Sequence, residues 1–287
     1  MSNFSAPDGT SLSYHRSGQG APLVCLPGGP MRDSAYFGDL GGLDAHRTLI
    51  RLDLRGTGDS AVPADPASYR CDRQVDDVEA LREHLGLDTF DLLAHSAAGD
   101  LAVLYAARYP ERISRLVLVT PAAGSLGLGE EPDDRAEAAA LTAGEPWHPA
   151  ALAALEATKQ GVFDFAGFAP LIYGRWGAAE QEHVAQRAVQ AHPELVGLYY
   201  ADGAFDPSVT GAALASLTAP VLVLAGAYDG SPNPAFAARI AAAFPAASPP
   251  SCPRSATSRG SASRPTSSTP SGNSSTAELG AWQDRWQ

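Results

Sequence analysis

The chain has no histidine after His192, although it continues to residue 287. It holds three cysteines, Cys25, Cys71 and Cys252, whose spacing matches neither a CxxC pair nor a zinc site, so disulfide staples and a bound metal are not expected. No apolar run reaches the roughly 18 residues of a membrane span. The first residues lack the basic and apolar segments of a secretory signal. These absences predict a soluble, cytoplasmic protein without a membrane partner.

The charge balance excludes another class of partner. The formal net charge is −12, and residues 248–287 carry four arginines against Glu278 and Asp284, which leaves −14 on residues 1–247. An acidic surface repels a phosphate backbone, so no nucleic-acid partner is expected. Hydrophobic residues make up 45% of the 287 residues, which is enough for one large core.

Short apolar runs alternate with amphipathic segments along much of the chain. Strands are predicted at 11–17, 22–27, 48–54, 90–94, 113–119 and 219–226. Helices are predicted at 75–85, 97–109 and 235–244. Several strands are continuously apolar, which is typical of a parallel sheet covered on both faces. The predicted fold class is therefore α/β, with a mostly parallel central sheet flanked by helices.

Two segments depart from this alternation. Residues 122–210 are rich in alanine and predict a helical cap inserted between strands, so that residues 1–121 and 211–247 form the core. Residues 248–287 begin with a stretch, Ser248 to Ser275, that has eleven serines and five prolines. Such a composition cannot bury enough apolar surface to offset the entropy lost on ordering, so this tail is predicted to be disordered.

Ser96 lies between a predicted buried strand and a predicted helix, in the run Ala94-His95-Ser96-Ala97-Ala98. A sharp strand-to-helix turn of small residues presents a serine hydroxyl as a nucleophile. An unactivated hydroxyl is a poor nucleophile, because it needs an adjacent base to take its proton. The sequence therefore predicts a nucleophile whose base must be found elsewhere.

Together with this turn, three further segments resemble the α/β-hydrolase family, most closely its proline iminopeptidase-like branch, over about residues 10–247. They are Pro27-Gly28-Gly29-Pro30, the run from Asp53 to Ser60, and Tyr228-Asp229-Gly230. The resemblance implies that Ser96 is the nucleophile, that Asp229 orients a histidine, and that the backbone N–H groups of Gly29 and Ala97 form an oxyanion hole. It also implies that the family's two elbow glycines are replaced here by Ala94 and Ala98. No cofactor is implied.

The histidine of the family's triad has no counterpart in the expected place, roughly 25 to 30 residues beyond the acid. His95 is expected to pack or to hydrogen-bond beside the nucleophile, and none of the other histidines is expected to replace the base. The last strand and the last helix of the fold are also expected to be missing. Either the tail is a natural Ser/Pro-rich terminus, or a frameshift near Ser248 replaced the original ending.

The frameshift hypothesis rests on a second translation of the tail. When the last base of each codon is joined to the first two bases of the next, residues 255–261 can encode Gly-His-Phe-Pro-Trp-Leu. This string resembles the family's segment around the catalytic histidine. The regrouping leaves one base of each new codon free, so the histidine position also admits Asn, Asp or Tyr.

Two functions are predicted from these observations. The first is a serine hydrolase that cleaves a small amide or ester through an acyl-enzyme, with an aminopeptidase-like activity on a small molecule or short peptide, or else an esterase or lactonase activity. Glu145 is a candidate receptor for a substrate amine, or else a solvated helix-capping acid. The second is a catalytically dead hydrolase-like protein that has lost its base.

Overall fold

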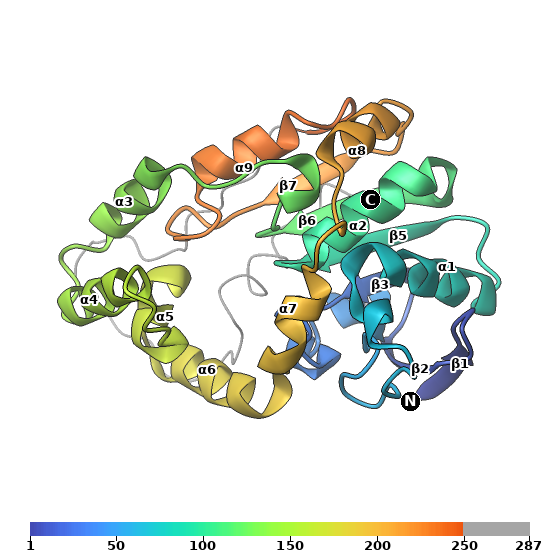
Figure 1. The fold of residues 1–287 in the computed structure, drawn as a ribbon, viewed down its shortest axis with the longest axis horizontal. Helices are drawn as coiled ribbons and strands as arrows, with labels where there is room; N and C mark the ends of the chain where they lie inside the picture. Colours follow the sequence, from blue (N-terminus) through green and yellow to red (C-terminus); the bar gives the residue numbers. More distant parts are fainter. Residues whose placement is uncertain (249–287) are drawn as a thin grey trace.

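The computed structural model of the chain describes residues 1–248, in which the strands form one seven-stranded sheet (Figure 1). The sheet order is β1-β2-β4-β3-β5-β6-β7. The strands are β1 (Ser2–Ser5), β2 (Ser11–Gly18), β3 (Ala21–Leu26), β4 (Arg47–Leu52), β5 (Phe90–His95), β6 (Ile113–Val119) and β7 (Val221–Leu224). β1 and β2 pair antiparallel, β2 is antiparallel to β4, and all pairs from β4 to β7 are parallel. The predicted mostly parallel α/β sheet is confirmed.

The continuously apolar strands are buried on both faces, as expected for a parallel sheet. Alternate residues of β3 divide between two apolar clusters, with Val24 and Leu26 in the larger one and Leu23 and Cys25 in the smaller one. The larger cluster is completed by helices α1 (Val75–His84), α2 (Ala98–Arg108) and α9 (Pro234–Ala241). Within the described residues, the smaller cluster is covered by the 3-10 turn Ser34–Phe37 and its neighbours, with no α-helix.

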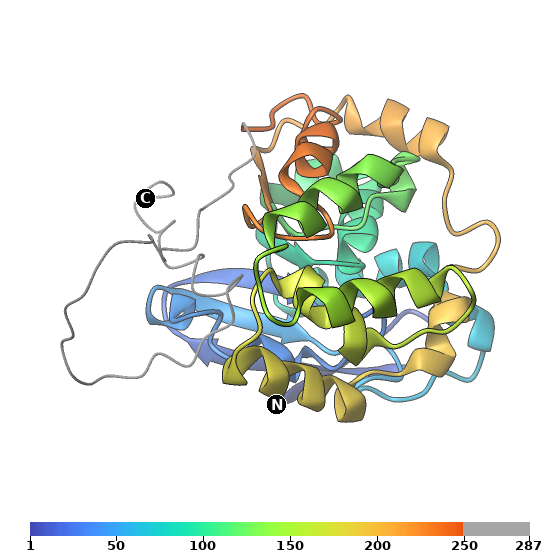
Figure 2. The same ribbon diagram turned by 90° about the vertical axis from the view of Figure 1, so that its left-hand side faces the viewer.

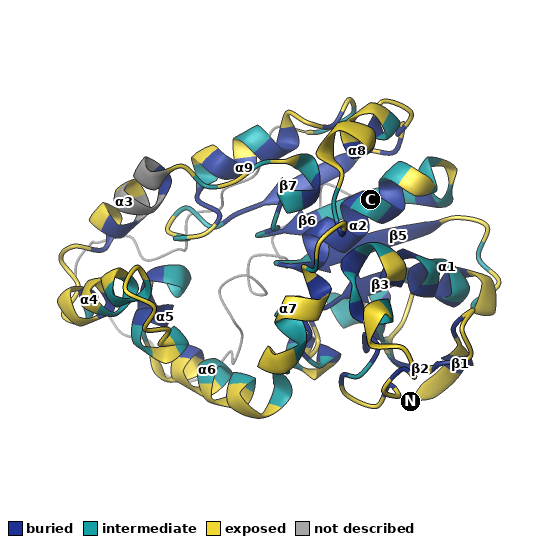
Figure 3. Cartoon of the chain, viewed as in Figure 1, coloured by how far each residue is buried: buried dark blue, intermediate teal, exposed yellow. Residues whose placement is uncertain are grey.

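Six helices lie between β6 and β7: α3 (Pro132–Leu141), α4 (His148–Thr158), α5 (Phe165–Tyr173), α6 (Ala178–Gln190), α7 (Val196–Tyr199) and α8 (Pro207–Leu214). Helices α4 to α6 lie apart from the sheet (Figure 1) and, seen from the side, in front of it (Figure 2). They are more exposed than the central strands (Figure 3). Helix α8 spans residue 210 and contributes the fully buried Leu214 to the larger core cluster. The division into core and cap stays a prediction.

The chain pairs with the outer edge of β7 just before the end of the described residues. After α9, the N–H of Val221 donates to the carbonyl of Ala246 (3.2 Å), and the N–H of Ser248 donates to the carbonyl of Val221 (3.0 Å). Val221 and Ala247 form a parallel bridge. The predicted disordered tail and the predicted loss of a last strand and helix lie beyond this point, outside the described residues. Among residues 1–248, we find no helix with the length and apolarity needed to cross a bilayer.

Candidate active site

Ser96 occupies a strained turn between β5, which ends at His95, and α2, which begins at Ala98. Its φ is 55°, in the left-handed region that a serine adopts only at a cost of about 1–3 kcal/mol. Three backbone hydrogen bonds hold the turn: Ser96 N–H donates to Val119 O (3.0 Å), and Ser96 O accepts from the N–H groups of Gly99 (2.8 Å) and Ala122 (2.9 Å). The serine is therefore fixed at the carboxyl end of a central strand.

The turn is closely packed, which explains the small residues around it. Ala94 and Ala98 are fully buried. A side chain on Gly28 would place its Cβ 2.8 Å from the Cβ of Ser96 and 2.6 Å from the carbonyl oxygen of His95. The glycine turn after β3 therefore lies directly against the serine turn.

The backbone N–H groups predicted to bind an oxyanion, those of Gly29 and Ala97, make no hydrogen bonds within the described residues. Gly29 has a φ of 126°, and a Cβ there would lie 2.8 Å from the N of Arg32, so only glycine fits. The carbonyl of Ala97 accepts a hydrogen bond from the buried Tyr199 hydroxyl (3.2 Å). That bond holds the peptide between Ala97 and Ala98, one residue beyond the proposed donor N–H.

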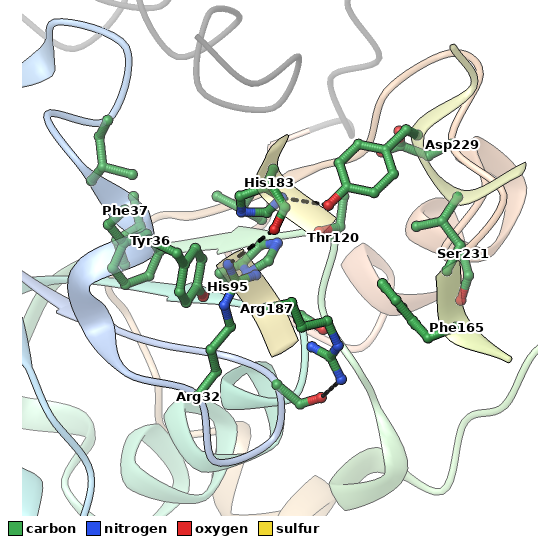
Figure 4. A pocket seen from close by; sticks show the side chains of 17 residues that line it. Arg32, Tyr36, Phe37, His95, Thr120, Phe165, His183, Arg187, Asp229 and Ser231 are labelled. Atoms are coloured by element: carbon green, nitrogen blue, oxygen red, sulfur yellow. Dashed lines mark hydrogen bonds between the residues drawn. The ribbon is translucent and has the colours of Figure 1, made fainter. Parts of the chain in front are cut away.

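A cavity of about 230 Å³ lies at this turn (Figure 4). Its lining includes Ser96, Gly29 and Asp229, which the sequence analysis selected. Ala97 is not part of the lining and is buried behind Ser96. Glu145 is exposed in the turn before α4, and the structure does not bring it to this cavity. The volume is below the roughly 300–1,000 Å³ of sites for drug-sized ligands, so the cavity suits a small molecule.

Asp229 follows β7 and is mostly buried. Its Oδ2 accepts a hydrogen bond from the N–H of Gly226 (2.6 Å). Within the described residues, no histidine or other cation bonds to this carboxylate. Burial raises its pKa from 3.8 to about 6, and the bond from Gly226 offsets only part of that rise. Residues 1–248 thus hold a carboxylate at the cavity without supplying the positive partner of a triad.

We expect Asp229→Asn to stabilise the protein above pH 6. Because the folded-state pKa is raised, the penalty for ionised Asp229 is absent below about pH 4, grows as the pH rises to 6 and is complete above it. A shift of this size predicts a gain of about 1–3 kcal/mol at pH 8 and almost none at pH 4. Urea denaturation at both pH values measures it. Asp202→Asn, at an exposed site, is the control. A loss of stability at pH 8 would mean that the carboxylate has a cationic partner.

Two histidines line the cavity, yet neither has the contacts of a triad base. His95 shares a hydrogen bond between its Nδ1 and the hydroxyl of Tyr36 (2.8 Å), which confirms the bond expected for it. His183 makes the same kind of bond to Tyr173 through Nδ1, and its Nε2 is buried without a partner among the described residues. Burial and nearby positive charges lower the pKa of His95 to about 3 and that of His183 to about 4, so both are neutral near pH 7.

Several cavity residues were not selected from the sequence. Tyr36 links the two turns, because its hydroxyl accepts the N–H of Gly28 (2.8 Å) and bonds to His95. Arg32 and Arg187 line the same cavity and come from segments far apart in the sequence. No motif marks these positions, and only the fold brings them together.

The segment from Asp53 to Ser60 is hydrogen-bonded to the segment that follows β3. The Oδ1 of Asp53 accepts the N–H of Ser34 (2.9 Å), and its Oδ2 accepts the N–H of Asp59 (3.0 Å) and contacts His15 (2.8 Å). The ligand atoms of His15, Asp53 and Asp59 lie within 4.8 Å of one another, but these backbone bonds already occupy the Asp53 oxygens. The cluster is therefore explained by loop structure.

The fold and this site define the class of protein. The family described as alpha/beta hydrolase fold matches residues 21–249, and the chain belongs to that family. An esterase from Thermogutta terrifontis, solved with malate bound, superposes with a TM-score of 0.64 at 21% identity, over 88% of this chain and 90% of that chain.

Curated relatives match only part of the chain. A proline iminopeptidase from Lactobacillus helveticus is 43% identical over 101 residues, which is 34% of each protein. A cis-3-alkyl-4-alkyloxetan-2-one decarboxylase from Shewanella oneidensis is 36% identical over 124 residues, which is 42% of this chain and 39% of that protein. The chain thus covers about two fifths or less of these relatives' length.

Proposed function

We propose that this chain is a serine hydrolase for a small amide or ester, with Ser96 as the nucleophile of an acyl-enzyme mechanism. The observation that carries the proposal is the strained Ser96 turn, which opens on a cavity shared with Asp229 and Gly29. In the forward step the Ser96 hydroxyl attacks the substrate carbonyl, and the N–H groups of Gly29 and Ala97 bind the oxygen that becomes negative. Asp229 is the group that would orient a histidine.

The substrate assignment is a proposal on weaker support. The similarity to a proline iminopeptidase over a third of the chain favours an aminopeptidase-like activity. Solved structures of the same fold include an esterase and an enzyme that degrades N-acyl homoserine lactones, and an ester or lactone is the alternative substrate. The solvent-exposed position of Glu145 does not support its role as an amine receptor. Residence in the cytoplasm stays a prediction.

We further propose that the chain as written lacks an efficient base, because a frameshift near residue 248 replaced the last strand, the histidine turn and the last helix. Two features of the described residues support it. The chain begins to pair parallel to β7 at Ala247, where another strand would lie. The smaller apolar cluster, which includes Leu93, Leu222 and Leu224, has no α-helix over it within residues 1–248.

Labelling with a fluorophosphonate probe tests the nucleophile. We expect slow labelling that Ser96→Ala abolishes, at a rate at least about 10³-fold below that of a complete triad, because removing the base costs the hydroxyl most of its reactivity. The measurement is the labelled fraction against time, read by intact-protein mass spectrometry on soluble, folded chain.

Histidine variants give the matched controls for this experiment. His183→Gln and His148→Gln are expected to label at the rate of the unchanged chain, because neither histidine is bonded to Asp229 or Ser96 in the structure. Fast labelling of the unchanged chain that His183→Gln reduces as strongly as Ser96→Ala would show that His183 is the base. Labelling unaffected by Ser96→Ala would overturn the proposed nucleophile.

A catalytically dead, ligand-binding protein is the second candidate function. The Asp229 carboxylate favours it, since no histidine or other cation bonds to that group among the described residues. This candidate predicts ligand binding in the cavity together with no measurable turnover.

A further inference from the structure

Two arginines from different segments of the chain line the cavity at Ser96. Arg32 lies in the turn after β3, three residues beyond Gly29, and Arg187 lies on α6. Both connect the turn to the helix: the Nε and Nη2 of Arg32 donate to the Oε1 of Gln190 (3.0 and 2.7 Å), and the Nη2 of Arg187 donates to the carbonyl of Gly29 (3.1 Å). Figure 4 shows both side chains on the same side of the cavity.

Aromatic rings hold both guanidinium groups in place. The Cζ of Arg32 lies 4.3 Å from the centre of the Tyr36 ring, and the Cζ of Arg187 lies 4.4 Å from the centre of the Phe165 ring. A guanidinium stacked on a ring keeps its planar face packed and its N–H edge free to meet an acceptor. The two side chains are therefore positioned before any ligand arrives.

Neither guanidinium has a carboxylate partner in the described part of the chain. Arg32 is 4% exposed, and its bonds go to the neutral Gln190 side chain and to a carbonyl of His183. The nearby carboxylate of Asp33 is bonded instead to the N–H of Gly58 and to His192. Burial and the charge of Arg187 lower the pKa of Arg32 to about 10, and burial lowers the pKa of Arg187.

Arg32 is buried and Arg187 is half-buried. Positive charges withdrawn from water without a counter-ion are costly, and a ligand that supplies the opposite charge offsets that cost. This pair stands out because residues 1–247 carry a formal charge of −14. Acidic residues are abundant in the chain, yet none of them bonds to these two arginines within the described residues. Within residues 1–248, the two guanidinium groups are thus open to an acceptor that enters the cavity.

We propose that Arg32 and Arg187 bind a carboxylate of the substrate, so that the cavity takes a small ester or amide that carries a negative charge. The assignment of that molecule as a substrate rests on the proposed function, whereas its binding does not. A bidentate contact from a planar guanidinium matches carboxylate geometry. The substrate would thus be negatively charged, whereas an acidic receptor at Glu145 would bind a positively charged amine.

Equilibrium binding tests the proposal without turnover. We expect isothermal titration of the full chain at pH 7.5 and low ionic strength to detect binding of at least one of succinate, glutarate and adipate. The uncharged diamide of the same length is expected to bind at least about tenfold more weakly, because charge-assisted hydrogen bonds are lost. Equal binding of diacid and diamide, or no binding of any of the three diacids, would overturn the proposal.

Arginine variants locate the site. Arg187→Gln is expected to weaken diacid binding at least about tenfold. Arg16→Gln, at an exposed position of β2 that is not part of the cavity lining, should leave it unchanged. Thermal unfolding of each variant shows that it is folded. Arg187→Lys keeps the positive charge but not the planar guanidinium, so its diacid affinity is expected to lie between those of Arg187→Gln and Arg16→Gln. Unchanged binding by folded Arg187→Gln overturns the assignment. Absence of Ser96 labelling with intact diacid binding would overturn the proposed hydrolase alone.

Discussion

A gene with one base inserted near codon 248, which restores the alternative reading frame, is expected to produce a chain that hydrolyses its substrate at least about 10³-fold faster than the present one. The reason is that Ser96, Gly29 and Asp229 line one cavity, and in the proposed mechanism an imidazole between Ser96 and Asp229 is the group that residues 1–248 do not supply. A histidine there would take the serine proton, and the carboxylate would stabilise the imidazolium that forms. Initial rates on p-nitrophenyl acetate and on proline p-nitroanilide measure the gain.

Matched variants of the restored chain separate a repaired triad from improved folding. Ser96→Ala in the restored chain should remove the gain, and Asp229→Asn should remove most of it, because the imidazole would lose its correct tautomer. Urea denaturation of both chains shows whether stability has also changed. A restored chain that is folded and no faster than the present one would refute the frameshift hypothesis.

Arg55→Met is expected to lower the free energy of unfolding by about 3–5 kcal/mol, because it leaves the Asp77 carboxylate buried without a cation. Asp77 is 1% exposed, and Arg55 donates two hydrogen bonds to its carboxylate, from Nε to Oδ2 (2.8 Å) and from Nη2 to Oδ1 (2.5 Å). Arg55 also reaches Asp8 (2.7 Å), and these carboxylates hold its pKa above its ordinary value. The pair therefore ties the loop after β4 to the first turn of α1.

A double variant and a surface control complete this test. Arg55→Met combined with Asp77→Leu should recover most of the loss, since no buried charge is left unpaired. Arg108→Met removes an exposed ion pair with Asp76 (2.9 Å) and should change stability by less than about 1 kcal/mol. Urea denaturation followed by tryptophan fluorescence gives all three values. A small effect for Arg55→Met alone would show that water or a shifted side chain replaces the cation.

Much of the sheet was predictable because its strands are short, continuous apolar runs. β3, β5 and β6 lie where those runs predict them, to within one residue at each end. β1 was not predicted, since Ser2–Ser5 contains a single apolar residue, Phe4, and a short edge strand needs no more than that. Strand ends were less predictable. β7 is half as long as the apolar run 219–226, because Ala219 and Ala225 are buried in the core but lie outside the paired strand.

The candidate site was predictable only where a motif marks it. Ser96, Gly29 and Asp229 each follow a strand at the same end of a parallel sheet, so their meeting at one cavity follows from the topology. Arg187 lies on an alanine-rich helix whose spacing shows that it is amphipathic but not what it covers. Its partner Arg32 is 155 positions earlier in the chain, and no local pattern encodes their approach.

The pairing of residues 246–248 with Val221 also defines a junction for grafting. Because the two hydrogen bonds at Val221 fix both direction and register, a strand continued from Ala247 would run alongside β7 and finish near Asp229. A terminal strand, loop and helix taken from a homologue can thus be fused after Ser248 with no new linker. C-terminal segments from different enzymes can therefore be compared as chimeras that share residues 1–248 of this chain.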